Sequence, residues 1–466
     1  MKKIFTLTLF LVVLINNSYS QCFVTLTNRY NHNIGIKTDG TLWGWGWGDW
    51  GQLSNSTNFN EPNPIQIGSA NDWIAAIAAD ASTLAIKNNG TLWGTGRNNF
   101  GQLGMGNTNA VNNIVQIGTA TNWKQVAPAD FFTIGLKLDG TIWGWGQNDG
   151  YQVGDGTSIE RHTPVLIGTA TDWKMVATCA ARQGFALKNN GTLWGWGMNF
   201  SGMLGDSSVQ SLNIPTQLNV ANDWKTISVG SNHILAIKNN GTLWAWGGGG
   251  NGQCGDNLPL AYFRDAPHQI GTDTWTTVTG GQNFSLGIKT DGTLWAWGKN
   301  DVGQLGDGTT TDQANPVQIG TDTNWASVAA GLRHVVALKT NGAVFTWGIN
   351  IFCQLGNGTT TSTNSPAAIT ITGCSLVNEV FGNQNNNFTI SPNPAQNELN
   401  LDYKGNEVIN TIFIYDISGK EVFKTQPVAT TALMATFSIA ELQSGSYLVV
   451  LKNKDQTVVS KQLVKE

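Results

Sequence analysis

Charged side chains are scarce in this chain of 466 residues, since only 12% are Asp, Glu, Lys or Arg and the net charge is −4. A chain this close to neutral lacks the basic surface that binds nucleic acid or an anionic membrane. Histidine and cysteine are also rare, with five of each, and no ligand partners stand at metal-site spacing. Helical periodicity of apolar residues is absent as well, which argues against an α-helical or α/β fold.

A long apolar run is missing everywhere except at the N-terminus. There Lys2 and Lys3 precede the apolar residues 4–15, and Ser18-Tyr19-Ser20 follow. This order predicts a secretory signal peptide over residues 1–20. The run is shorter than the roughly 20 residues of a membrane span, although a retained N-terminal anchor is the alternative. We therefore expect an exported chain with no transmembrane span after cleavage, in a compartment that permits disulfides.

Glycine and tryptophan are abundant instead, with 56 and 20 residues. Both recur in a segment such as D-G-T-L-W-G-W-G, which is found seven times at spacings of 50 or 51 residues. Alternating apolar residues flank each Asn-Gly or Asp-Gly, which favours a two-residue hairpin with positive φ, and each unit fits four short strands. The turn glycines are Gly40, Gly90, Gly140, Gly191, Gly241, Gly292 and Gly342.

Seven such units predict an all-β fold, a seven-bladed β-propeller over residues 21–375, with a linear β-solenoid as the alternative. The two ends match, because Phe23 and Trp325 each lie 17 residues before their turn glycine. Cys22 then precedes the first unit and Cys374 follows the last, so ring closure predicts a disulfide between them; two unrelated thiols are the alternative. Separate buried thiols are expected at Cys179, Cys254 and Cys353.

The run W-G-x-N-x-x-G-Q-L-G at residues 297–306 and the run G-L-R-H-V-V-A-L-K at residues 331–339 resemble the RCC1 repeat. The resemblance covers roughly residues 22–374 and implies a seven-bladed propeller. It implies little about function, because RCC1-like proteins include a chromatin-bound nucleotide exchange factor, a light sensor, parts of ubiquitin ligases and secreted bacterial inhibitors of enzymes.

The C-terminal part has a different pattern. The polar stretch of residues 382–387 predicts a linker over residues 376–387, and the alternating segments of residues 388–466 predict a small Ig-like β-sandwich. This segment resembles the type A sorting domain of the type IX secretion system of Bacteroidetes; an ordinary accessory sandwich is the alternative. The resemblance implies recognition by the outer-membrane translocon, removal of the domain, and secretion or attachment to the cell surface. The motif residues are Pro392, Asn393, Pro394, Asp416, Gly419, Gly445, Tyr447 and Lys465.

Residues with catalytic or metal-binding chemistry occupy repeat positions. His32, His233 and His334 share a slot that holds Phe132 and Phe284 in other units, which indicates packed residues rather than metal ligands. Asp155, Asp206, Asp256 and Asp307 share another slot, with Asn357, and are expected to cap turns by Asx hydrogen bonds; calcium binding is the alternative. We expect no catalytic residue, no metal and no cofactor.

The first and third connections of each blade are expected on one face, opposite the Asn-Gly or Asp-Gly turn. Eighteen tryptophans recur with the repeat and indicate packing between blades, but Trp47 and Trp50 have no counterparts. Exposed aromatic residues on such a face favour recognition of a protein or glycan, and packing between blades is the alternative for each one. The candidate residues are Tyr30, Trp47, Trp50, Phe100, Phe131, Tyr151, Phe200, Tyr262, Phe263 and Phe352.

Together these features predict a secreted or cell-surface binding propeller, like an adhesin, receptor or inhibitor, that recognises a protein or glycan through its loops. A secreted glycan-active enzyme is the first alternative, although paired carboxylates are not evident in the loops. Guanine-nucleotide exchange, by analogy with the RCC1 repeat alone, is the second, and export argues against it.

Overall fold

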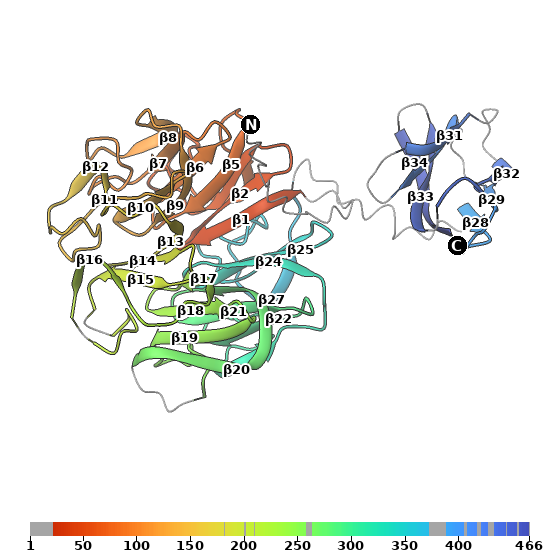
Figure 1. The fold of residues 1–466 in the computed structure, drawn as a ribbon. Coiled ribbons are helices and arrows are strands. Elements are labelled where there is room, and N and C mark those ends of the chain that lie inside the picture. Colours follow the sequence, from red (N-terminus) through yellow and green to blue (C-terminus); the bar gives the residue numbers. More distant parts are fainter. Residues whose placement is uncertain are drawn as a thin grey trace, which may run out of the picture. The chain divides into compact units, whose positions relative to one another are not determined.

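The computed structural model describes residues 22–371 except 181, 200, 201, 209 and 258–262, and residues 388–465 except 405–407, 417–420, 427–432, 444 and 454–455. The chain divides into two compact units, residues 21–374 and residues 375–466 with 1–20. Every regular element in the described parts is a strand (Figure 1). A helix long and apolar enough to cross a membrane does not occur among the described residues. The predicted signal peptide and linker lie outside them.

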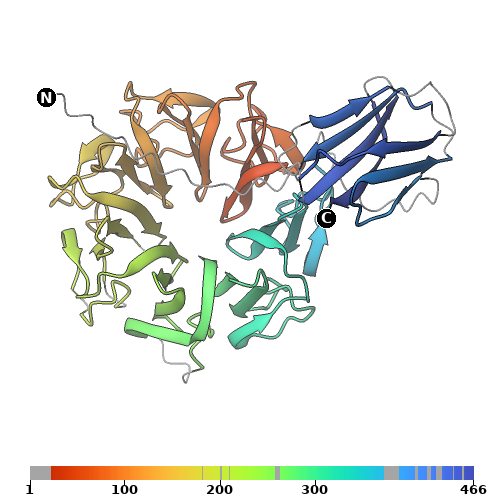
Figure 2. The same ribbon diagram turned by 45° about the vertical axis from the view of Figure 1, so that its right-hand side comes forward.

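The first unit is a ring of seven blades, each a four-stranded antiparallel sheet built from one sequence repeat (Figure 2). The first strand of each blade contacts the first strands of its neighbours and therefore lies nearest the ring axis. Blades 1 to 3 comprise β1 (Phe23–Arg29), β2 (His32–Lys37), β3 (Leu42–Gly46) and β4 (Glu61–Gln66); β5 (Trp73–Ala78), β6 (Ser82–Lys87), β7 (Leu92–Gly96) and β8 (Val111–Ile117); and β9 (Trp123–Pro128), β10 (Phe132–Lys137), β11 (Ile142–Gly146) and β12 (Arg161–Leu166).

Blades 5 and 6 share one long strand, which serves as the outer strand of one blade and the inner strand of the next. Blades 4 and 5 comprise β13 (Trp173–Cys179), β14 (Gln183–Lys188), β15 (Leu193–Gly197) and β16 (Leu212–Gln217); and β17 (Trp224–Val229), β18 (His233–Lys238), β19 (Thr242–Gly248) and the start of β20 (Phe263–Gly280). Blades 6 and 7 comprise the end of β20, β21 (Phe284–Lys289), β22 (Leu294–Gly298) and β23 (Gln313–Gln318); and β24 (Trp325–Ala330), β25 (His334–Lys339), β26 (Val344–Gly348) and β27 (Thr363–Ala368).

Tryptophan side chains join each blade to the one before it. The Trp145 indole N–H donates to the carbonyl of Gln102 in the preceding blade at 2.8 Å. Equivalent bonds recur around the ring, and the Trp45 indole donates to the carbonyl of Gln354 at 3.1 Å, which joins blade 1 to blade 7. The ring is therefore closed, and the linear solenoid is excluded.

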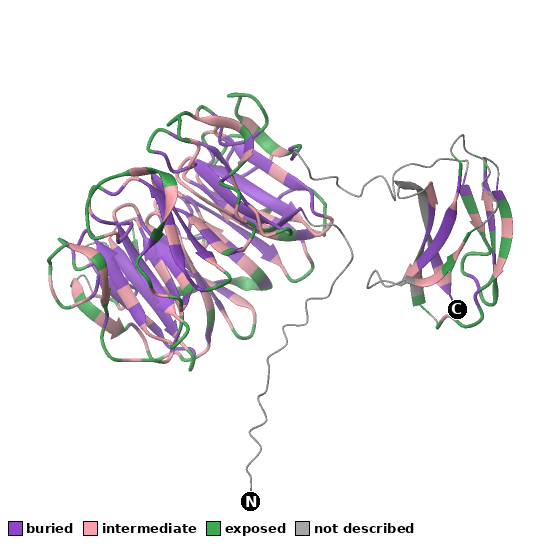
Figure 3. Cartoon of the chain, turned by 90° about the horizontal axis from the view of Figure 1, so that it is seen from above, coloured by how far each residue is buried: buried purple, intermediate pink, exposed green. Residues whose placement is uncertain are grey.

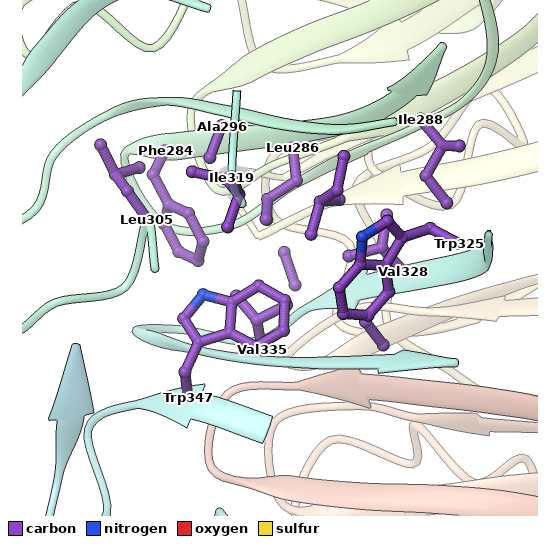
Figure 4. Close-up of a cluster of buried hydrophobic side chains, with 13 residues drawn as sticks. Phe284, Leu286, Ile288, Ala296, Leu305, Ile319, Trp325, Val328, Val335 and Trp347 are labelled. Atoms are coloured by element: carbon purple, nitrogen blue, oxygen red, sulfur yellow. The ribbon is translucent and has the colours of Figure 1, made fainter. Parts of the chain in front are cut away.

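The hydrophobic core lies within and between the blades, where buried residues follow the strands and exposed residues follow the connections (Figure 3). Between blades 6 and 7, Trp325 and Trp347 pack with Phe284 and Leu305 (Figure 4). A tryptophan buries roughly 200 Å², which at about 25 cal/mol per Å² is about 5 kcal/mol before the entropy of ordering is subtracted. The repeated tryptophans are thus the main packing elements of the ring.

The Asp-Gly and Asn-Gly hairpins differ from the two-residue turn that the sequence predicted. In blade 1 the Lys37 N–H donates to the Thr41 carbonyl and the Gly40 N–H donates to the Lys37 carbonyl, so the loop has three residues. Gly40 has a φ of +78°, whereas Asp39 does not have a positive φ. The Asp39 carboxylate instead accepts from the Thr41 N–H and hydroxyl at 2.9 and 2.6 Å, which bridges Gly40 and fixes the end of the turn.

The second unit is a sandwich of two antiparallel sheets around one core. One sheet contains β28 (Phe388–Ser391), β29 (Glu398–Tyr403) and β32 (Leu433–Ser438). The other has the order β31-β30-β33-β34, formed by β30 (Thr411–Asp416), β31 (Glu421–Thr425), β33 (Gly445–Asn453) and β34 (Gln456–Lys465). Both sheets contribute to the core, for example through Leu401 and Val449.

Candidate functional site

Backbone hydrogen bonds place the first and third connections of each blade on one face, here called the loop face. The Trp47 N–H of the third connection donates to the Asn31 carbonyl of the first at 2.9 Å, and Arg97 and Ala81 are joined in the same way at 2.8 Å. The turn glycines belong to the other face, because the Gly40 carbonyl accepts from the Trp73 N–H at the start of the next blade.

The candidate aromatic residues differ in exposure. Trp50 and Tyr151 are each 37% exposed and Phe263 is 49% exposed, so these three are open to a ligand. Phe200 and Tyr262 lie outside the described residues. The half-buried candidates are Tyr30, Trp47, Phe100, Phe131 and Phe352.

Two aromatic contacts cross the boundaries between blades. The rings of Trp47 and Phe352 lie 6.2 Å apart across the closure of blades 1 and 7. The rings of Phe100 and Phe131 lie 5.0 Å apart between blades 2 and 3.

Arg97 completes the second group, because its guanidinium lies 5.0 Å from the Trp50 ring centroid and 4.8 Å from that of Phe131. Residues from neighbouring blades therefore form one surface on the loop face. We call this surface the aromatic arc, which consists of Phe352, Trp47, Trp50, Arg97, Phe100 and Phe131.

A polar group that the sequence analysis did not identify lies beside the aromatic arc. Tyr30, Asp80 and Asp130 occupy the same position of the first connection in blades 1, 2 and 3. The Tyr30 hydroxyl donates to the Asp130 carboxylate. The Arg97 guanidinium lies 3.5 Å from a carboxylate oxygen of Asp80, and Arg29 donates to the Pro128 carbonyl in blade 3 at 3.0 Å. We call this group the rim cluster, which consists of Arg29, Tyr30, Asp80, Arg97 and Asp130.

Burial disfavours the ionised forms of the two carboxylates in the rim cluster. Burial and the nearby charge of Asp130 raise the pKa of Asp80 to about 6, although Arg97 and Arg29 act in the opposite direction. Burial also raises the pKa of Asp130. Burial and the charge of Asp130 raise the pKa of Tyr30, which therefore stays protonated as a donor. Perturbed carboxylates of this kind concentrate at functional sites.

A small cavity of about 140 Å³ lies at the ends of the innermost strands and shares Arg29 and Tyr30 with the rim cluster. Its wall also contains glycines of blades 5 to 7, including Gly230, Gly281 and Gly331. There the neighbouring first connections are bonded to one another by their backbones, for example Ser231 N–H to the Gly281 carbonyl at 3.0 Å. Around the ring axis, the first connections of blades 5 to 7 therefore contact one another through backbone groups, whereas those of blades 1 to 3 contact one another through the side chains of the rim cluster.

The shared histidine slot is structural, as the sequence predicted. His32, His233 and His334 are fully buried, and burial lowers the pKa of each to about 3. Each ring Nε2 lies within hydrogen-bond distance of the next blade, for example 2.8 Å from the Ser285 hydroxyl in the case of His233.

The aspartate slot caps turns. The Asp155 carboxylate accepts from the Thr157 N–H at 3.0 Å, which is the expected Asx hydrogen bond. A group of His, Cys, Asp and Glu residues with the geometry of a metal site does not occur among the described residues.

The cysteines are all buried where the structure describes them. Cys179, Cys254 and Cys353 are separate buried thiols, as predicted. Cys22 lies in the core of the ring closure with Trp45 and Val336. Cys374 lies outside the described residues, so its pairing with Cys22 stays a prediction.

The sorting motif gathers around the C-terminal strand of the sandwich. The Asn393 side-chain carbonyl accepts from the Val464 N–H at 2.8 Å, and the Ala395 N–H donates to the Val464 carbonyl at 2.8 Å. Gly445 faces Lys465 across β33 and β34, and Asp416 faces Tyr447 across β30 and β33. Pro392 and Pro394 flank Asn393 in the exposed turn, and Gly419 lies outside the described residues.

Comparison with known families agrees with both units. The model of the Regulator of chromosome condensation (RCC1) repeat matches residues 39–86, 139–187, 190–237, 291–338 and 341–377. A second model of the same repeat matches residues 224–253, 275–304 and 325–352, and together the two cover more than half of the chain. The model of the Secretion system C-terminal sorting domain matches residues 389–466. No curated protein sequence matches the chain.

Solved structures share the propeller fold. Human WBSCR16 is 20% identical, with a TM-score of 0.65 over 72% of this chain and 95% of that chain. Yeast RCC1 (Prp20), solved bound to Kap60, is 20% identical, with a TM-score of 0.64 over 80% of this chain and 88% of that chain. Prp20p from Saccharomyces cerevisiae gives 19% identity and a TM-score of 0.63, over 80% of this chain and 90% of that chain. At these identities the likeness concerns the fold alone.

Proposed function

We propose a role in recognition for this chain, which belongs to the RCC1-repeat family and carries a type IX secretion sorting domain at its C-terminus. The sorting domain marks the chain for secretion to the cell surface or beyond. There the propeller acts as a binding protein, an adhesin, receptor or inhibitor that holds a protein or glycan on its loop face. The predicted signal peptide first delivers the chain to the periplasm.

The observation that supports this proposal most strongly is the aromatic arc. Its residues do not recur in every blade, so the repeat does not require them for packing. Trp50 is exposed while its ring lies beside the Arg97 guanidinium. Tryptophan and arginine are the residue types that contribute most binding energy in interfaces. An exposed group of this composition, beside a charged rim, fits a surface for a large ligand.

The loop face fits binding better than catalysis. A glycan-active enzyme needs two carboxylates, one to transfer a proton and one to attack or to activate water. Asp80 and Asp130 are the carboxylate pair of the rim cluster, but Asp130 accepts a hydrogen bond from Tyr30 and is also close to Arg29. We therefore propose recognition without turnover. Guanine-nucleotide exchange does not fit a chain that leaves the cell.

Substitution of Trp50 tests the proposal. The purified protein captures its partner from surface extracts or from a glycan array, and Trp50→Ala is expected to weaken capture at least 10-fold without changing the melting temperature. Leu138→Ala is the matched control, because Leu138 is 67% exposed on the turn face. Equal capture by both variants would contradict a role for the loop face, and a large loss of stability in Trp50→Ala would show that this tryptophan is a packing residue.

A further inference from the structure

The rim cluster leaves buried polar atoms without partners. Asp130 Oδ2 accepts from Tyr30, but Asp130 Oδ1 is buried and has no hydrogen-bond partner among the described residues. Arg97 Nε, which is a donor, is also buried without a partner among the described residues, and a basic ligand does not supply the acceptor that it lacks. Nearly all buried polar atoms in folded proteins are paired, and an unpaired one costs about 1–3 kcal/mol. The unpaired Asp130 acceptor at the edge of an exposed aromatic surface indicates a missing hydrogen-bond donor.

The two neighbouring cations do not satisfy the carboxylates. Arg29 extends from blade 1 to the Pro128 carbonyl in blade 3 and to the Thr178 hydroxyl in blade 4. Arg97 lies against aromatic rings and reaches Asp80 only at 3.5 Å. Burial and the charge of Asp130 together outweigh the charges of Arg97 and Arg29, so the pKa of Asp80 is raised and its ionised form is disfavoured. A group that relieves this imbalance must donate hydrogen bonds and carry positive charge.

We propose that the rim cluster is a subsite for a basic side chain, lysine or arginine, presented by a partner protein. The cationic head group lies between Asp80 and Asp130, and its aliphatic stem packs against Phe131. This inference rests on the proposed function of the loop face, which it narrows from a protein or glycan to a protein with an exposed basic residue.

The geometry of the aromatic arc favours a protein over a glycan. Sugars stack on a free, flat ring face, but the arc rings are tilted to each other, by 42° for Trp47 and Phe352 and by 57° for Phe100 and Phe131. The Arg97 guanidinium already lies beside the rings of Trp50 and Phe131. Arg97 thus shows within the chain how this site holds a cation, between aromatic rings and a carboxylate.

Titration with short peptides tests the subsite. Acetyl-tetra-arginine amide and acetyl-tetra-lysine amide are titrated into the purified protein at about 0.15 M salt, where exposed charges farther apart than about 8 Å are screened. Asp80→Asn and Asp130→Asn are each expected to weaken binding at least 10-fold, and Asp130→Asn keeps an acceptor for Tyr30. Asp149→Asn is the matched control, because it removes the same charge from the loop face, where Asp149 pairs with Arg182 at 2.7 Å.

The pH dependence of the affinity for the basic peptides gives a second test of the subsite. Protonation of Asp80 removes a charge that the ligand needs, so wild-type affinity is expected to fall between pH 7 and pH 5, while Asp80→Asn shows a smaller change over that range.

Equal affinities for Asp80→Asn and Asp149→Asn would overturn the subsite, as would binding of chitohexaose in place of the basic peptides. If Trp50→Ala loses capture of the surface partner while Asp80→Asn binds the peptides normally, the proposed function stands and the subsite does not.

Discussion

Tryptophan serves the repeat in three positions, of which the first two pack on each other and the third joins neighbouring blades. The first position is the residue that begins the innermost strand of a blade. Trp173, at the start of β13, packs edge-on against Trp194, and the Lys188 ammonium lies within 4.9 Å of both ring centroids. The third position, such as Trp196, is fully buried and bonds to the preceding blade. Spacing alone shows that these eighteen tryptophans recur with the repeat, because a repeat makes each position visible several times.

The bond from the third tryptophan position should contribute measurably to stability. Trp145→Phe removes the indole N–H donor, while the Gln102 carbonyl keeps its bond from the Thr133 hydroxyl, so the free energy of unfolding is expected to fall by about 0.5–1.5 kcal/mol. Urea denaturation of the purified protein measures the change. Trp50→Phe, at an exposed ring, is the control and should change the stability by less than about 0.5 kcal/mol. Equal effects of the two substitutions would show that the indole bonds between blades contribute nothing.

The rim cluster could not be predicted in the same way. The repeat alignment places Tyr30, Asp80 and Asp130 in one slot, but it does not show that the Tyr30 side chain reaches past the second blade to Asp130. That contact depends on side-chain length and on the small radius of the ring at its axis. The interpretation of Tyr30 as one more exposed aromatic residue missed its hydroxyl, which is the part that bonds.

At the scale of elements, strand order followed from the sequence, but turn geometry did not. Four strands per repeat were visible from alternation, whereas the loop after Lys37 has three residues rather than the two expected from Asp-Gly alone. The carboxylate of Asp39 decides the difference by bonding to Thr41. The long β20, which joins two blades, was also not foreseen, because its connection replaces the usual loop by continuous strand.

The turn at Pro392 to Pro394 is bonded to β34, which lies about 70 residues later in the sequence. Asn393 holds the backbone of β34 next to the C-terminus, so Asn393→Ala is expected to release the end of this strand and to reduce export. The measurement is the fraction of protein in the medium and at the cell surface against that in the periplasm, by immunoblot. We expect at least a 5-fold shift towards the periplasm.

Gln396→Ala supplies the comparison, since Gln396 is exposed next to the same turn. Normal surface delivery of Asn393→Ala would mean that the sorting domain tolerates a free terminal strand.

At the scale of the whole molecule, ring closure was predicted correctly from matching ends. The closure repeats the contacts between other blades, with Phe23 and Trp45 packed against Val336 and Leu338 of the last blade. A fold with seven similar interfaces distributes its stability evenly, so any group that titrates between blades affects the whole ring.

The buried histidines make that stability depend on pH. Their pKa in the folded state is about 3, below the ordinary value of 6.5, so the unfolded chain binds protons first on acidification. Their full contribution is present above about pH 6.5 and is lost as the pH falls towards 3. Near pH 5 the loss is about 2 kcal/mol for each histidine. Asp80 and Asp130 act in the opposite sense, because burial raises the pKa of both, that of Asp80 to about 6, and raised values favour folding at low pH, but they are two groups against three histidines.

Melting temperatures between pH 7.5 and pH 4.5 measure this dependence, and they are expected to fall as the pH falls. His233→Phe should flatten the curve, because phenylalanine occupies this slot naturally in two blades and Ser285 keeps its bond to the Gln253 carbonyl. His162→Asn, at a half-buried histidine outside the shared slot, is the comparison. A flat curve in the unaltered protein would contradict the account of the buried histidines.

The most direct test of the central claim is hydrogen–deuterium exchange of the purified protein with and without its captured partner. If the loop face binds, amides of residues 29–32, 47–52, 97–102 and 130–133 become protected, while the turns around Gly40, Gly90 and Gly140 do not change. Protection confined to the turn face, or to the outer strands of the blades, would contradict a binding site on the loop face.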